Sequence, residues 1–339
     1  MCLIFRVDWD MQKVLNLVLI NTLLLLVSVN AQPTELTELK KVQIPEEIFL
    51  GGLLQIDMDD DRILITDNSI GQVVLFKGSE WKVLDPEDCH PGFWFQPIQA
   101  KFGDNDEIFI TNSGIWGFRF KKNGECVGAV EKGSRFFTAE NFYYGNDIVG
   151  INADFAQKHI NLWDKKGKEM ETLFSVTNEF PNAEYRIQGG GIFEADNTVY
   201  FAKVLEPIIY SFNRETKELN SHEFNSDLFK PITADISNDI KDPKFLKEVG
   251  RVFKNNSVIQ SLYHLNQTTG ILFFSQNVGE GTSYYGLIFD LKDLKIKETL
   301  ILKSLPVFVE NNEFVFIERE SEGYETEIVE LVFKTRKKK

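Results

Sequence analysis

The chain has 339 residues, of which 43% are hydrophobic and 29 are phenylalanine, so it can bury a sizeable core in one large β domain or two ordinary ones. The formal net charge of −14 argues against a nucleic-acid groove and against a surface for anionic lipids, because both require concentrated Lys and Arg. We therefore expect a globular protein with no nucleic-acid partner.

Residues 1–31 have the composition of an export signal. A short cationic start at Met11-Gln12-Lys13 precedes the largely apolar residues 14–29, and Val29-Asn30-Ala31 has the small-residue spacing of a cleavage site. We predict translation from Met11, cleavage after Ala31, and a mature chain that is exported to the periplasm or the extracellular space without membrane insertion. An uncleaved anchor is the alternative, although the apolar stretch is short for a membrane-spanning helix.

From residue 57 onward, a polar turn followed by a short run rich in β-branched and aromatic residues recurs six times. The copies lie at residues 57–68, 102–113, 143–154, 193–204, 266–277 and 309–320. The first apolar residues after the turns are Ile63, Ile108, Ile148, Val199, Ile271 and Phe314. Most of the spacings between them suit a four-stranded propeller blade of about 40–50 residues. Charged hairpins such as 117–130 and 160–174 supply the third and fourth strands.

These repeats predict an all-β fold, a six-bladed β-propeller of four-stranded antiparallel blades within residues 36–334. The last repeat, at 313–334, lacks a fourth strand, whereas residues 36–44 have the charged, alternating pattern of an outer strand. We expect this N-terminal strand to close the ring and to cover exposed strand edges. The basic residues 335–339 are expected to form a solvated tail.

The aspartate-rich stretch Asp57–Asp61 coincides with the first of the polar turns. It aligns with the Asp- and Asn-rich turns at 104–106, 196–197 and 311–312, and these residue types are typical of tight turns. A calcium loop would also contain a Gly and a distal Glu at defined spacings. We therefore expect a turn at Asp57–Asp61 and not a metal site.

Extra residues at 226–256 separate the fourth and fifth repeats. Asp242-Pro243 has the pattern of a helix start, with Asp as the N-cap and Pro in the first turn. The apolar residues that then fall on one helical face are Phe245, Leu246, Val249 and Phe253. We predict a helical insertion in the connection between blades 4 and 5 on the top face, either as a functional lid or as packed decoration.

The turn-and-strand segments 59–68 and 105–114 and the hairpins at 120–125 and 163–169 resemble those of TolB-like and NHL-like six-bladed β-propellers, particularly exported members from Bacteroidetes-type bacteria. The resemblance covers roughly residues 36–334. It implies an architecture and not an activity, because this scaffold carries many chemistries and many binding roles.

Ligands of such propellers usually bind on the top face, which is built from the loops between second and third strands and from the connections between blades. In this sequence these segments are rich in Trp, Tyr, Phe and Arg, which anchor ligands well. The candidate ligand-binding residues are Trp94, Trp116, Arg135, Phe155, Tyr185, Arg186, Gln188, Tyr284 and Tyr285. Alternatively, aromatic residues in these loops seal the gaps between blades.

No catalytic set emerges from the sequence. The four histidines do not converge, and neither G-x-S-x-G nor H-E-x-x-H is present. We infer a binding protein without a cofactor, whose top face takes a peptide, a glycan or a partner protein. The alternative is a calcium-dependent, lactonase-like hydrolase or lyase with its site at the central channel.

Two smaller features carry structural expectations. Cys89 and Cys126 remain after Cys2 is removed with the leader; they can pair in an oxidising compartment, and no neighbouring His or Cys supports zinc. Gly189–Gly191 begins a strand near the channel and has no helix after it, so it indicates a close approach of backbones and not a phosphate loop.

Overall fold

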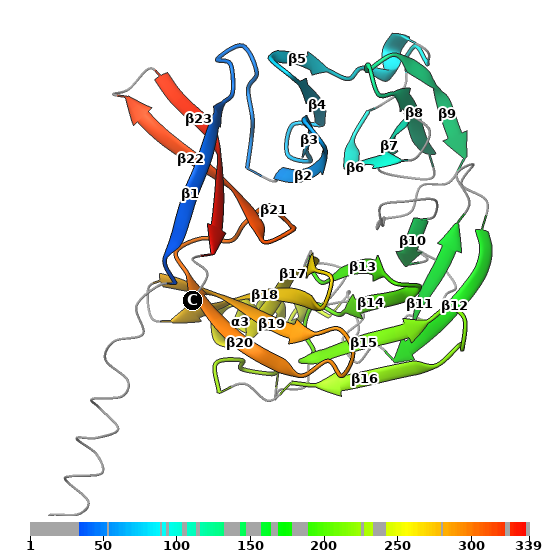
Figure 1. Ribbon diagram of the computed structural model, residues 1–339, viewed down its shortest axis with the longest axis vertical. Helices are drawn as coiled ribbons and strands as arrows, with labels where there is room; N and C mark the ends of the chain where they lie inside the picture. The colour runs from blue at the N-terminus through cyan, green and yellow to red at the C-terminus, as the bar shows by residue number, and fades with distance from the viewer. Residues whose placement is uncertain are drawn as a thin grey trace, which may run out of the picture. The chain divides into compact units, whose positions relative to one another are not determined.

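A computed structural model describes residues 34–52, 54–88, 90–92, 95–103, 107–112, 116–131, 143–146, 157–163, 169–177, 189–224, 227–232, 242–278, 281–322 and 326–336. From Glu35 onward they belong to one compact unit, Glu35–Lys339 (Figure 1). Within the described part of the chain, no helix combines the length and the apolar character needed to span a bilayer.

Six antiparallel sheets follow one another along this unit; five have four strands, and one has three within the described residues. Sheet 1 contains β2 (Leu54–Asp59), β3 (Arg62–Asp67), β4 (Gln72–Lys77) and β5 (Glu80–Val83). After the 3-10 helix η1 (Pro86–Asp88), sheet 2 contains β6 (Pro97–Gly103), β7 (Glu107–Asn112), β8 (Trp116–Lys121) and β9 (Cys126–Glu131). Sheet 3 contains β10 (Tyr143–Asn146), β11 (Gln157–Trp163) and β12 (Glu169–Thr177).

Sheet 4 contains β13 (Gly191–Ala195), β14 (Thr198–Ala202), β15 (Ile208–Asn213) and β16 (Leu219–Glu223). The helix α3 (Phe245–Asn255) precedes sheet 5, which contains β17 (Ser257–Asn266), β18 (Thr269–Val278), β19 (Gly281–Asp290) and β20 (Ile296–Leu302). Sheet 6 has the order β21 (Phe308–Glu310), β22 (Glu313–Glu322), β23 (Thr326–Arg336) and β1 (Leu36–Gln43).

First strands contact each other at four of the junctions between neighbouring sheets. β2 contacts β6, β13 contacts β17, β17 contacts β21, and β21 contacts β2. Antiparallel four-stranded sheets that meet in this way form a β-propeller, so the predicted all-β propeller architecture is confirmed at this level.

Strand β1 pairs antiparallel with β23 and supplies the outermost strand of sheet 6, as the sequence pattern predicted. β23 extends to Arg336, so the expected solvated tail is wrong for Thr335 and Arg336. The guanidinium of Arg336 forms an ion pair with Glu298 of β20 at 2.5 Å, which ties this strand to sheet 5. Residues 337–339 lie outside the described part of the chain.

Hydrophobic clusters fill the spaces between neighbouring sheets, namely sheets 1 and 2, 3 and 4, 4 and 5, 5 and 6, and 6 and 1. Strands buried on both faces have continuous apolar runs. Residues Ile63–Ile65 and Leu272–Phe274 show this, since none of them is more than 3% exposed. The repeated apolar runs in the sequence therefore reflect sheets packed on both sides.

The corners, defined as the connections between first and second strands, have the predicted turn chemistry. Asp60 has φ 53°, and the pairs Asp196-Asn197 and Asn311-Asn312 have φ between 48° and 63°, values that Asn and Asp tolerate better than most residues. The third corner, around Ile148, lies outside the described residues.

Asp57 requires a correction to the expectation that Asp57–Asp61 is only a turn. It lies in β2 and is 5% exposed. Its carboxylate accepts hydrogen bonds from Nζ of Lys101 at 2.6 Å and from the backbone N–H of Phe102 at 2.7 Å, both in β6. Asp57 therefore joins sheet 1 to sheet 2, and only Asp60 and Asp61 form the turn between the strands.

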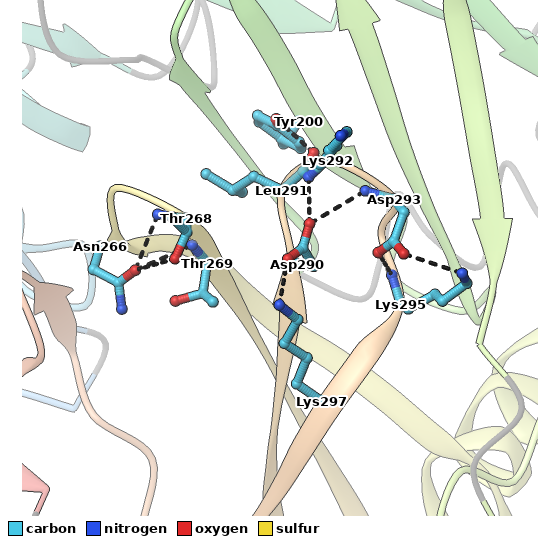
Figure 2. A network of polar contacts seen from close by, with 10 residues as sticks. All are labelled: Tyr200, Asn266, Thr268, Thr269, Asp290, Leu291, Lys292, Asp293, Lys295 and Lys297. Atoms are coloured by element: carbon cyan, nitrogen blue, oxygen red, sulfur yellow. Dashed lines mark hydrogen bonds and ion pairs between the residues drawn. The ribbon is translucent and has the colours of Figure 1, made fainter. Parts of the chain in front are cut away.

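The corner and the β19–β20 hairpin of sheet 5 lie at the same end of that sheet and are held by side-chain oxygens (Figure 2). Oδ1 of Asn266 accepts a hydrogen bond from the N–H of Thr268 at 3.1 Å, and Oδ1 of Asp290 accepts one from the N–H of Lys292 at 2.8 Å. A hydrogen bond from Lys297 lowers the pKa of the Asp290 carboxyl. The backbone of each turn is therefore held by a side chain two residues earlier in the chain.

A tyrosine links this end of sheet 5 to sheet 4. The hydroxyl of Tyr200 in β14 donates a hydrogen bond to the carbonyl oxygen of Leu291 at 2.9 Å (Figure 2). Burial of the phenol raises the pKa of Tyr200 to about 12. The hydroxyl thus remains a donor at neutral pH, so the link between the sheets persists.

Helix α3 lies in the connection between sheets 4 and 5, where the insertion was predicted. It begins at Phe245, and Oδ1 of Asp242 accepts a hydrogen bond from the N–H of Lys244 at 2.9 Å, so Asp242 helps to start the helix without being its N-cap. Phe245 and Val249, two residues of the predicted apolar face, are buried. Leu246 and Phe253 are 67% and 39% exposed, so only part of the predicted apolar face packs on the propeller.

Candidate functional site

The predicted top face is called the loop face from here on. It consists of the loops between the second and third strands of each sheet and the connections from one sheet to the next. By alternation of antiparallel strands, these segments lie at the opposite end of each sheet from the corners. Most buried polar side chains of the described residues lie there: Thr66, Asp67, Thr111, Asn112, Lys203, Glu206, Ser257 and Gln276. Polar groups removed from water need partners, and the connections between sheets supply several of them.

Asp67, at the end of β3, fixes two segments of the loop face. Its side chain is fully buried, and Oδ1 accepts hydrogen bonds from the N–H of Ser69 at 2.9 Å and from its Oγ at 2.5 Å. The other oxygen accepts a hydrogen bond from the N–H of Gly51, in the connection that leads to β2. A single carboxylate therefore holds the β3–β4 loop against the incoming chain.

Sheets 2 and 6 use related contacts. Oδ1 of Asn112, at the end of β7, accepts a hydrogen bond from the N–H of Gln96 at 2.5 Å. The guanidinium of Arg319 in β22 donates to the carbonyl oxygens of Leu50, at 3.1 Å, and of Gly51. The connections before β2 and β6 are thus fixed by polar side chains from second strands.

Sheet 4 carries a buried ion pair in the corresponding position. Lys203 is 1% exposed, and its Nζ donates to the carbonyl oxygen of Thr177 at 2.6 Å and pairs with the carboxylate of Glu206. The same Nζ lies 5.7 Å from the centre of the Tyr210 ring. Because the ammonium is occupied by partners from sheets 3 and 4, it joins these sheets and is not presented to a substrate.

The glycines Gly189–Gly191 make the close backbone approach that the sequence predicted. The N–H of Gly190 donates to the carbonyl oxygen of Ile259 in β17 at 3.0 Å. A Cβ at Gly191 would lie 2.5 Å from the backbone nitrogen of Leu262. Glycine is therefore required here so that the first strands of sheets 4 and 5 can pack against each other.

Few of the predicted ligand-binding residues have described side chains. Those outside the described residues are Trp94, Arg135, Phe155, Tyr185, Arg186 and Gln188, and the side chain of Trp116 is also outside them, although its backbone begins β8. Tyr284 and Tyr285 are consecutive, half-buried residues of β19 that pack against different hydrophobic clusters, because side chains alternate between the faces of a strand. Tyr285 stacks on Phe274 with ring centres 5.0 Å apart, so its ring contributes to the core between sheets.

Sequence reasoning missed the polar side chains that hold the loop face. The signal was present, since Asp67, Asn112 and Lys203 each lie four residues after an apolar anchor of the repeat, at the end of a buried strand. An alignment of the repeats therefore places these three polar residues in one column, four residues after the anchor. Its role was hidden because its partners are backbone groups, which have no sequence signature.

Titratable groups do not gather into a catalytic arrangement in the described part of the chain. No group of three or more His, Cys, Asp or Glu residues is placed there to hold a metal ion. His264 lies near the corner of sheet 5 and stacks on Phe193 with ring centres 5.6 Å apart. Burial lowers the pKa of His264, which therefore has the character of a packed, neutral ring.

Cys126, the first residue of β9, is disulfide-bonded. Cys89, the partner that the sequence allows for Cys126, lies outside the described residues. The 3-10 helix η1, which ends at Asp88, contacts β9, the strand that begins at Cys126.

No protein-family model and no curated protein matches this sequence. Among solved structures, a protein from Bacteroides fragilis described as predicted to be exported has a TM-score of 0.56 and 12% identity, covering 90% of this chain and 96% of that one. BamB from Moraxella catarrhalis has a TM-score of 0.39 and 12% identity, covering 88% of this chain and 100% of that one. A chain of the mitotic checkpoint complex has a TM-score of 0.46 and 9% identity, with 92% and 99% covered. The first similarity supports the fold alone, and this chain has the β-propeller fold.

Proposed function

We propose that this protein is an exported, TolB-like or NHL-like six-bladed β-propeller whose loop face binds a peptide, a glycan or a partner protein. The observation that carries the binding role is the set of buried polar side chains that fix the connections of the loop face. A face whose backbone is held in place loses little conformational freedom when a ligand binds, so it favours recognition.

Three features support six blades and a closed ring. The chain forms six consecutive sheets, and we assign the three-stranded sheet 3 as one of the blades. β1 pairs with β23, and β21 of the last sheet contacts β2 of the first. An outer strand taken from the N-terminus joins the two ends of the fold, which protects edge strands from pairing with other chains.

Two features support export. The Bacteroides fragilis protein with the same fold is described as predicted to be exported, and its similarity spans 90% of this chain. The disulfide at Cys126 is of a kind that persists mainly in oxidising compartments. Together with the leader-like residues 1–31, these features favour the periplasm or the extracellular space.

The test is thermal unfolding of the protein with and without calcium, repeated with a panel of glycans and peptides. A ligand that binds the folded state raises the unfolding temperature. We expect a shift with one ligand class and its loss in Arg135→Ala, a predicted contact residue of the loop face. The matched control is Lys292→Ala, an exposed basic residue at the opposite end of sheet 5, which should keep the shift (Figure 2).

Two outcomes would contradict this proposal. If no member of the panel shifts unfolding, the loop face is not a binding surface for these classes. If calcium alone raises the unfolding temperature and chelation removes the shift, the lactonase-like alternative with a channel metal gains support instead.

A further inference from the structure

Helix α3 presents three parallel ridges, each with the spacing i, i+4, i+7 that places side chains on one helical face. The first ridge is buried and consists of Phe245, Val249 and Val252. The second is exposed and consists of Leu246, Gly250 and Phe253. The third is exposed and basic, and consists of Lys247, Arg251 and Lys254.

The buried ridge fixes the helix on the propeller. It packs in a hydrophobic cluster with Val204 and Leu205 of the β14–β15 loop and with Val258 of β17. After the helix, Nδ2 of Asn256 donates to the carbonyl oxygen of Pro231 at 2.7 Å. The other two ridges are therefore held in a defined orientation on the loop face.

The apolar ridge carries two of the exposed large hydrophobic side chains of the described residues. Leu246 is 67% and Phe253 is 39% exposed, and they lie on the same side of the helix. Between them, a Cβ built on Gly250 would meet no atom within 4 Å. Two exposed apolar side chains with open space between them offer a place for an apolar side chain from a partner.

The basic ridge differs from most other basic side chains of the protein. Lys and Arg on the strands and hairpins pair with carboxylates, for example Lys41 with Glu330 and Arg214 with Glu194. In contrast, no ion pair or hydrogen bond of the described residues involves the side chains of the basic ridge. A chain with a net charge of −14 thus keeps three cations unpaired in one row.

We propose that the two exposed ridges of α3 are the docking surface for an acidic amphipathic peptide segment of a partner protein. An apolar side chain of the segment packs over Gly250 between Leu246 and Phe253, and its carboxylates pair with the basic ridge. In this mode of recognition, an amphipathic helix of the partner lies against the surface. Its apolar side chains, spaced by about one helical turn, contact the apolar residues there. The inference rests on the proposed function, because it assigns a partner class to one part of the loop face.

A peptide fits these ridges better than an anionic membrane does. A membrane surface would face the whole end of an acidic molecule, and its negative potential would oppose the net charge of −14. A peptide contacts only the helix, and at physiological salt charges farther than about 8 Å away are largely screened. Attraction by the basic ridge therefore dominates for the peptide and not for the membrane.

The experiment measures binding of two synthetic amphipathic helices to the purified chain by fluorescence anisotropy. One probe carries a Leu ridge beside a Glu ridge, and the other has Gln in place of every Glu. The variants are Arg251→Glu on the basic ridge and Leu246→Ser on the apolar ridge. Their controls are Lys303→Glu, which makes the same charge change in another connection of the loop face, and Leu219→Ser, an exposed leucine of β16.

We expect the Glu probe to bind better than the Gln probe, and Arg251→Glu and Leu246→Ser each to weaken binding about tenfold while the controls change it little. Equal binding of both probes, or equal effects of Arg251→Glu and Lys303→Glu, would overturn the proposal. So would Arg251-dependent binding to phosphatidylglycerol vesicles without binding of the Glu probe. A panel ligand that still shifts thermal unfolding while the Glu probe does not bind would leave the proposed function intact and refute this inference alone.

Discussion

Replacing Gly190 by alanine tests the close packing of the glycine segment against the end of β14 in sheet 4. Gly190 has φ 75°, and a Cβ at this position would lie 2.6 Å from the carbonyl oxygen of Ala202. An L-residue in the left-handed region costs about 1–2 kcal/mol, and forcing extra atoms into a packed site costs about 1–3 kcal/mol. We therefore expect Gly190→Ala to lower the free energy of unfolding by about 2–5 kcal/mol.

The assay is urea unfolding followed by far-UV circular dichroism, together with the thermal midpoint. For a domain of this size, about 2 °C of midpoint shift corresponds to 1 kcal/mol, so the variant should unfold about 4–10 °C below the parent protein. The shift should appear without any ligand, because the clash is within the folded chain.

The matched control is Gly250→Ala, in the middle of α3. A Cβ there meets no atom within 4 Å, and alanine forms helix better than glycine, so we expect stabilisation by about 0.5–1 kcal/mol. The reasoning is refuted if Gly190→Ala changes stability by less than about 0.5 kcal/mol, the range of ordinary surface substitutions.

Three further contacts give measurable expectations. Asp57→Asn should lower the free energy of unfolding in urea by about 3 kcal/mol, because it leaves Lys101 without its carboxylate. Adding Lys101→Met should restore part of that stability, and strictly additive losses from the two substitutions would show that the pair is not coupled. Tyr200→Phe removes the hydrogen bond to Leu291 and should cost about 1 kcal/mol, so an unchanged urea midpoint would argue against the link. The pKa of His264 is lowered by burial from its ordinary value of 6.5, so the folded state binds this proton less readily than the unfolded chain does. Stability from this group is complete above pH 6.5 and falls below it; in His264→Phe the difference in unfolding free energy between pH 7 and pH 5 should shrink, and an unchanged difference would assign the pH effect to other groups.

The corners and the strands after them followed from the sequence, because turn chemistry and buried strands are local properties. Asn311-Asn312 and Asp196-Asn197 require residues that tolerate positive φ, and the apolar runs that follow require burial on both faces. The pairing of β1 with β23 followed from a count of strands in the last repeat.

The roles of individual polar residues did not follow, because they depend on partners distant in the chain. Asp57 looked like part of a turn, and only its contact with Lys101 in the next sheet shows that it joins two sheets. Leu246 and Phe253 fitted a helical stripe, yet the propeller surface covers only one ridge of the helix. Helical periodicity gives the angle between side chains and not the width of the surface that receives them.

The pairing of β1 with β23 has a consequence for how the protein is made. Lys41 and Glu330, which form an ion pair across these strands, are 289 positions apart in the chain. A strand at the start of the fold must therefore wait until the opposite end of the chain has emerged, and during that delay its unpaired edge is open to other chains. A circular permutant that places β1 directly after β23 would turn this slow, distant pairing into a local hairpin, and it should reach the native state faster and with less aggregation.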